Sequence, residues 1–166
     1  EKVSNYLVEV YMNTRSYEAA LKSIERIAKP SAQIMEAKQK ILFQLGTQSF
    51  ANTNFEQALQ YLNQSIAIGQ YNRQTKADAY YWCGESYYRL NRMMEAARDF
   101  NAYLQLTTQP NNEMYALANY NLGYIAFHRK DYTQASNYFQ KYIQLEKGEN
   151  RTALADAYNR IGDCHL

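Results

Sequence analysis

The side chains best suited to covalent or metal chemistry in this 166-residue sequence are two cysteines and two histidines. Cys164 and His165 are adjacent, and adjacent residues of a helix do not face each other, so we do not expect an imidazole that activates a thiol. His128 stands apart, whereas a metal site needs further ligands close by. Cys83 is interpreted as a small buried core residue, as free cysteines usually are.

The short motifs that mark catalytic or cofactor sites are absent from the sequence. There is no H-E-x-x-H zinc motif, no glycine-rich phosphate loop and no G-x-G-x-x-G dinucleotide motif. Asp156, Arg160 and Asp163 have the spacing of neighbours on one helix face, and we interpret them as solvated surface charges. Because no acid, base, nucleophile and anion-binding group converge, we predict that the chain is not an enzyme and holds no metal or cofactor.

Composition excludes further classes of function. Lys and Arg number 18 against 16 Asp and Glu, a formal net charge of +2, which is unlike the clustered basic surface of nucleic-acid-binding modules. No segment approaches the roughly 18 consecutive apolar residues of a membrane-spanning helix. With 6 glycines and 2 prolines, the sequence also lacks the many turns of a β-sandwich. We therefore expect a folded chain that does not bind nucleic acid and does not insert into a membrane.

The sequence repeats with a period of 38 to 39 residues. One column of the repeat is glycine, with valine in its first copy: Val8, Gly46, Gly84, Gly123 and Gly162. A second column, twelve residues later, is alanine: Ala20, Ala58, Ala96 and Ala135. These columns predict four units and part of a fifth, over residues 1–30, 31–70, 71–110, 111–148 and 149–166. Because the outermost units are short, we expect a single array that is a fragment of a longer protein.

Each unit is expected to fold as two helices joined by a short polar turn. In the third unit the helices are predicted over 75–90 and 94–106, the second with an apolar stripe at helical spacing. A glycine inside a helix costs about 1 kcal/mol relative to alanine, so we interpret the two columns as the point where the paired helices approach most closely. The turns contain Asn or Asp, which tolerate left-handed backbone: residues 13–15, 52–54, 91–92 and 130–131.

These columns resemble the tetratricopeptide repeat, a helix–turn–helix unit that carries W-x₂-L-G-x₂-Y followed by Ala, Phe and Pro. The best match consists of Tyr80, Cys83, Gly84, Tyr87, Ala96 and Phe100. The resemblance covers essentially the whole chain and implies an all-α fold, a right-handed superhelical solenoid of stacked helix pairs. The tyrosine-rich A-x-x-Y-x-x-G form is also similar to bacterial envelope repeats of the Tol–Pal-associated and outer-membrane assembly types. That likeness would place the chain in the periplasm, and a cytoplasmic location stays open.

In this repeat family the first helices line a concave groove that binds segments of other proteins, and the resemblance implies the same here. The matching positions are Phe43, Tyr81, Trp82, Glu85, Arg89, Tyr120, Asn121, Tyr124 and His128. Tyr, Trp and Arg are enriched at binding hot spots, so we expect a protein or peptide partner. Members that hold a terminal carboxylate use Lys and Asn where Tyr81 and Glu85 stand, so we expect a neutral or basic segment. Some of these rings instead pack between units, and the sequence leaves each assignment open.

Two other functions also stay open at the level of sequence. Aromatic and amide side chains suit sugars as well as peptides, because they stack on rings and form hydrogen bonds, so glycan or small-ligand binding is one alternative. The other is a purely architectural array that spaces domains or associates with itself through its uncapped ends. Glycan arrays would test the first alternative, and light scattering over a range of concentrations would test self-association.

Overall fold

Eight α-helices and one short 3-10 helix make up the described part of the computed structural model, residues 16–108, 110 and 112–166, which contains no β-strand. They are α2 (Tyr17–Glu25), α3 (Ala32–Ala51), α4 (Phe55–Ile68), η1 (Gly69–Tyr71), α5 (Arg73–Arg89), α6 (Met93–Leu106), α7 (Glu113–His128), α8 (Tyr132–Leu145) and α9 (Arg151–Cys164). The predicted all-α solenoid is confirmed. Val8 and the predicted first helix of the first unit fall in 1–15, outside the described residues. Among the helices described, none combines the length and the hydropathy that a membrane crossing requires.

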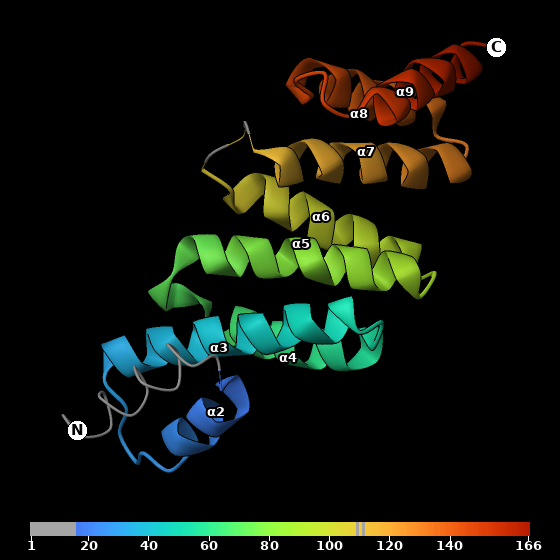
Figure 1. The fold of residues 1–166 in the computed structure, drawn as a ribbon. Helices are drawn as coiled ribbons and strands as arrows, with labels where there is room; N and C mark the ends of the chain where they lie inside the picture. Colours follow the sequence, from blue (N-terminus) through green and yellow to red (C-terminus); the bar gives the residue numbers. More distant parts are fainter. Residues whose placement is uncertain (1–15, 109, 111) are drawn as a thin grey trace.

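The helices stack in sequence order from α2 to α9, as Figure 1 shows. They pack mainly in the pairs α3–α4, α5–α6 and α7–α8, and each second helix also packs on the first helix that follows it. Each pair therefore contacts its neighbours along the stack, which is the arrangement of a solenoid. In the third unit, the helices predicted over 75–90 and 94–106 are observed at Arg73–Arg89 and Met93–Leu106.

Each helix pair is closed by a large side chain of the second helix that lies against the glycine of the first. A Cβ atom at Gly84 would lie 2.8 Å from the ring of Phe100, too close for a side chain to be accommodated without movement of the ring. The other two pairs repeat this contact, Gly46 with Leu62 and Gly123 with Phe139. The alanine column is fully buried: Ala20, Ala58, Ala96 and Ala135. Glycine is therefore needed at this position, because any side chain would displace the leucine or phenylalanine of the second helix that packs against it.

Each turn within a pair leaves the first helix through a left-handed residue. Thr53, Asn91 and Lys130 have φ angles of 62°, 60° and 64°. In every case the next N–H donates to a carbonyl five residues back: Asn54 to Ser49, Arg92 to Tyr87 and Asp131 to Ala126. The left-handed backbone predicted for these turns is present, but an asparagine adopts it only in the turn of the α5–α6 pair. The turn predicted over 13–15 lies outside the described residues.

Asparagine side chains cap the first helices α5, α7 and α9, and Ser31 caps α3. Asn72, Asn112 and Asn150 each accept a hydrogen bond from the N–H three residues later. Different side chains hold these links in place. The fully buried Gln39 donates from Nε2 to the carbonyl of Asn72 at 2.8 Å. The hydroxyl of Tyr103 donates to Oδ1 of Asn112 at 3.0 Å. The caps fix where each first helix begins and therefore which side chains it presents.

Candidate functional site

Side chains of consecutive first helices meet in a row along the stack, which we call the first-helix face. Its members come from α3, α5, α7 and α9 and are all half-buried: Phe50, Trp82, Glu85, Asn121, Tyr124 and Asp156. The row follows from the repeat, because residues three and four apart share one side of a helix and each first helix has the register set by its glycine. Its three stretches differ in chemistry.

The stretch between α3 and α5 is built from aromatic rings. Phe50 packs edge-on against Trp82, with ring centroids 5.0 Å apart, and against Phe55 at 5.2 Å. The guanidinium of Arg89 lies 5.4 Å from the centroid of Phe50 and 5.9 Å from that of Phe55, within the range of cation–π attraction. This end of the face therefore offers an apolar surface covered in part by one positive charge.

The stretch between α5 and α7 is built around a carboxylate. Glu85 accepts a hydrogen bond from Nδ2 of Asn121 at 2.5 Å and another from the hydroxyl of Tyr81 at 3.1 Å. Burial raises the pKa of the Glu85 carboxyl, although these two hydrogen bonds and the charge of Arg89 act in the opposite direction. The carboxylate thus links two helix pairs, while its charged form remains short of stabilising partners.

The stretch between α7 and α9 is built around a second carboxylate. Asp156 accepts hydrogen bonds from the hydroxyls of Tyr120, at 2.7 Å, and of Tyr124. Arg160 lies 3.7 Å from Asp156 and 3.0 Å from Asp163, so the three charges pair along α9 as their spacing predicts. Asp156 is nevertheless more than a solvated charge, because it joins α9 to α7. Burial and the hydrogen bond to Asp156 raise the pKa of Tyr124 to about 12, so its hydroxyl stays a donor at neutral pH.

The residues predicted to line the groove divide according to burial. Tyr81 is 3% exposed and its ring centroid lies 5.6 Å from that of Phe100, so the ring belongs to the core of the α5–α6 pair. The ring of Tyr120 packs on Tyr142 at 4.9 Å, and Phe43 lies against the core. Phe43 and Tyr120 are half-buried, as are Trp82, Glu85, Asn121 and Tyr124, whereas Arg89 and His128 are exposed. Trp82 lies against the same core as Phe43, and the ring of Tyr124 packs on Phe139 at 5.2 Å.

Sequence reasoning missed the part that Asp156 plays in the first-helix face. A signal was available, because Asp156 lies six residues before the glycine column, at the repeat position occupied by Lys40, Asp78 and Leu117. That position is one helical turn before Arg160 and its equivalents, and therefore on the same side of each first helix. Phe50 and Phe55 were missed as a ring pair for a different reason: they lie on either side of a turn, where helical spacing does not apply.

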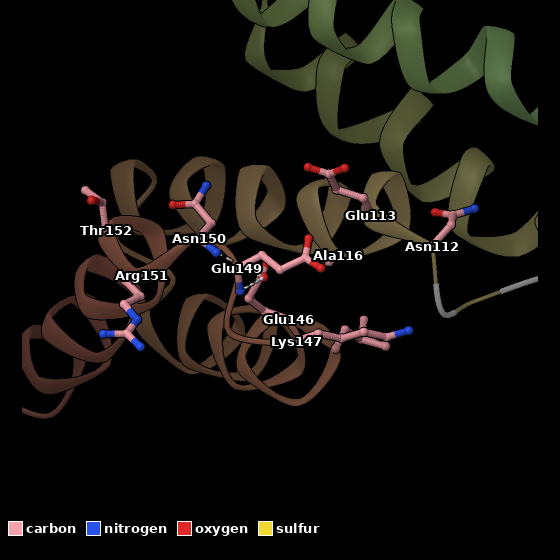
Figure 2. A pocket seen from close by; sticks show the side chains of 10 residues that line it. Asn112, Glu113, Ala116, Glu146, Lys147, Glu149, Asn150, Arg151 and Thr152 are labelled. Atoms are coloured by element: carbon pink, nitrogen blue, oxygen red, sulfur yellow. Dashed lines mark hydrogen bonds between the residues drawn. The ribbon is translucent and has the colours of Figure 1, made fainter.

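An open pocket of about 700 Å³ lies between the start of α7 and the link from α8 to α9. Figure 2 shows its lining residues: Asn112, Glu113, Ala116, Leu145, Glu146, Lys147, Glu149, Asn150, Arg151 and Thr152. One oxygen of Glu146 accepts hydrogen bonds from the N–H groups of Glu149 and Asn150. This carboxylate therefore stabilises the link between α8 and α9. Throughout residues 16–108, 110 and 112–166, no three His, Cys, Asp or Glu side chains are placed to hold a metal ion.

Family models with the description tetratricopeptide repeat match the sequence twice, over residues 43–113 and 116–148. The two matches together span more than half of the 166 residues. A search of curated protein sequences gave no significant match. The residues that carry most of the repeat are thus matched by family models, although the search of curated sequences found no match to the chain.

Solved structures share the fold at low sequence identity. A crystal structure of MamA protein is similar with a TM-score of 0.63 and 18% identity, covering 99% of this chain and 80% of that one. The structure of BtubC from P. vanneervenii has a TM-score of 0.67 and 12% identity, covering 98% and 70%. YrrB, described as a TPR protein with an unusual peptide-binding site, has a TM-score of 0.58 and 20% identity, covering 90% and 70%. At these identities the similarity shows the fold.

Proposed function

We propose that this chain, which belongs to the tetratricopeptide repeat family, is a non-catalytic scaffold that binds a partner polypeptide along its first-helix face. The observation that carries the proposal is the unbroken row of half-buried rings and hydrogen-bonding groups from α3 to α9. Repeats of this family typically mediate interactions between proteins, and the structurally similar YrrB has a peptide-binding site.

The chemistry of the row suits a polypeptide. Trp82 and Tyr124 are half-buried, so a partner side chain can cover the remainder of each ring and gain contact area at a small entropy cost. The amide of Asn121 lies between them along the stack and offers a donor and an acceptor of the kind that pair with backbone groups. Arg89 and His128 are exposed at the same ends of their helices, where Arg89 adds a positive charge at the margin of the row.

A peptide-display selection on the intact chain tests the proposal. We expect selected peptides to lose at least about tenfold in affinity for the double variant Trp82→Ala/Tyr124→Ala, since one factor of ten is about 1.4 kcal/mol and two hot-spot rings exceed it. Tyr158→Ala is the matched control, because Tyr158 is 61% exposed on α9 and is not in the row. Circular dichroism checks that each variant is folded. Equal affinity for the double variant and the parent chain would contradict the proposal.

Two finer expectations stay predictions. A periplasmic location rests on the tyrosine-rich form of the units alone, and fractionation of cells that express the full protein tests it. Self-association would give a molecular mass that rises with concentration in light scattering. Neither result changes the assignment of the partner-binding face.

A further inference from the structure

Glu85 differs from the other carboxylate of the first-helix face in having no cation within ion-pairing distance among the described residues. Asp156 lies 3.7 Å from the guanidinium of Arg160, whereas Glu85 forms no ion pair within the described residues. Its two partners, the amide of Asn121 and the hydroxyl of Tyr81, are neutral donors. A half-buried carboxylate held only by neutral groups is stabilised less than one that is paired.

Among the described residues, Arg89 is the cation whose charge acts on Glu85, and its guanidinium is held against two rings. Arg89 follows Glu85 by one helical turn, but its guanidinium lies over the rings of Phe50 and Phe55, at 5.4 and 5.9 Å. Its charge favours the ionised form of Glu85 without forming a hydrogen bond to it, and burial still raises the pKa of that carboxyl. The carboxylate is therefore available to a positive group that approaches the face from outside.

On the basis of the proposed function, we infer that the partner polypeptide presents a lysine or arginine side chain to Glu85. Trp82 precedes Glu85 by three residues and shares its side of α5. The methylene stem of a lysine or arginine can cover the half-buried indole while its charged head forms a charge-assisted hydrogen bond with the carboxylate. The partner segment is thus expected to be basic at one position and apolar beside it, the apolar residue covering the ring surface at Phe50.

A positional-scanning peptide array tests this inference. Ten-residue peptides with Lys, Arg, Gln, Glu or norleucine at each position in turn are probed with the parent chain, Glu85→Gln, Glu85→Lys and the control Glu149→Gln, which alters an exposed glutamate outside the face. We expect the parent chain and the control to select Lys or Arg at one position. Glu85→Gln should lose that preference by about tenfold, as expected for a charge-assisted hydrogen bond. Glu85→Lys should prefer Glu there.

The outcomes separate this inference from the function on which it rests. Peptide selection by the parent chain without a basic position, or a basic preference that survives in Glu85→Gln, overturns the inference and leaves the proposed function standing. A folded parent chain that selects no peptide contradicts both. Because glutamine has the shape of glutamate and can accept from Asn121, Glu85→Gln keeps the test valid even where Glu85→Lys does not fold.

Discussion

Helix α5 and helix α9 carry the same glycine signature in opposite surroundings. In α5, Gly84 lies against the ring of Phe100, and seven residues of the helix are buried. In α9, nothing lies within 4 Å of a Cβ placed at Gly162, and Ala157 is the buried residue. The glycine column therefore marks a site where a second helix packs, and its energetic effect depends on whether that helix is present.

The two helices are also joined to the rest of the stack differently. The α5 helix is held by rings and a deep core, and the hydrogen bond from Asn121 to Glu85 adds to an interface that already exists. In α9, Ala157 is buried and partly buried side chains such as Leu154 and Ile161 pack beside it, while two tyrosine hydroxyls of α7 donate to Asp156. Because α9 buries one residue and α5 buries seven, the hydrogen bonds to Asp156 should matter more for the stability of α9 than the bond to Glu85 does for α5.

The largest effect is expected from Phe100→Ala. Phe100 is fully buried, and a truncated buried phenylalanine typically costs about 3–5 kcal/mol of unfolding free energy because a cavity remains. Tyr158→Ala, on the open side of α9, should change stability by no more than about 0.5 kcal/mol. Urea unfolding followed by circular dichroism measures both. Similar losses of unfolding free energy in the two variants would contradict the difference in packing between the α5–α6 pair and α9.

Alanine in place of glycine should act with opposite sign in the two helices. Gly84→Ala places a methyl group 2.8 Å from the ring of Phe100, and such overpacking costs about 1–3 kcal/mol. Gly162→Ala meets no atom and gains helix propensity, up to about 1 kcal/mol. Thermal unfolding of the two variants measures the sign of each change in stability. A stabilised Gly84→Ala variant would show that the α5–α6 contact is looser than described.

Asp156→Asn should weaken the attachment of α9 by about 1–2 kcal/mol, because it replaces a charged acceptor of two hydroxyls by a neutral one. Hydrogen exchange should then be faster for amides of α9 and unchanged for those of α5. Asp163→Asn is the control, since Asp163 pairs with Arg160 on the same helix and touches no other helix through that pair. Unchanged exchange in α9 would mean that apolar packing holds it.

Glu85→Gln should slightly raise the stability of the chain at neutral pH. Burial raises the pKa of Glu85, so the folded state binds the proton more tightly than the unfolded state and loses stability as the pH rises through the folded pKa. The advantage of the glutamine variant should therefore be present at pH 7 and disappear as the pH falls below the ordinary pKa of glutamate. A difference that does not depend on pH would contradict this explanation.

The helices and the position of the glycine column could be predicted because they depend on spacing within about forty residues of sequence. The neighbour of the glycine could not, since the ring of Phe100, and not Ala96, lies nearest to a Cβ placed at Gly84. The side-chain contacts that join one helix pair to the next could not be predicted in this way. Tyr81 and Trp82 are adjacent aromatic residues, and residue type alone does not tell that Tyr81 is buried against Phe100 while Trp82 stays half-buried. The contact of Glu85 with Asn121 joins residues 36 apart and depends on the rotamers of both. Periodicity specifies the element, and packing across elements specifies the site.

The central claim is that the partner binds to the first-helix face. The alternative surface is the exposed side of α9, around Tyr158 and Gly162. Nuclear magnetic resonance of the ¹⁵N-labelled chain, titrated with a peptide chosen by the array, distinguishes the two surfaces directly. We predict that the indole N–H of Trp82 and the amide of Asn121 shift on titration, while amides around Tyr158 and Gly162 do not. Shifts confined to Tyr158, Gly162 and their neighbours would contradict the claim.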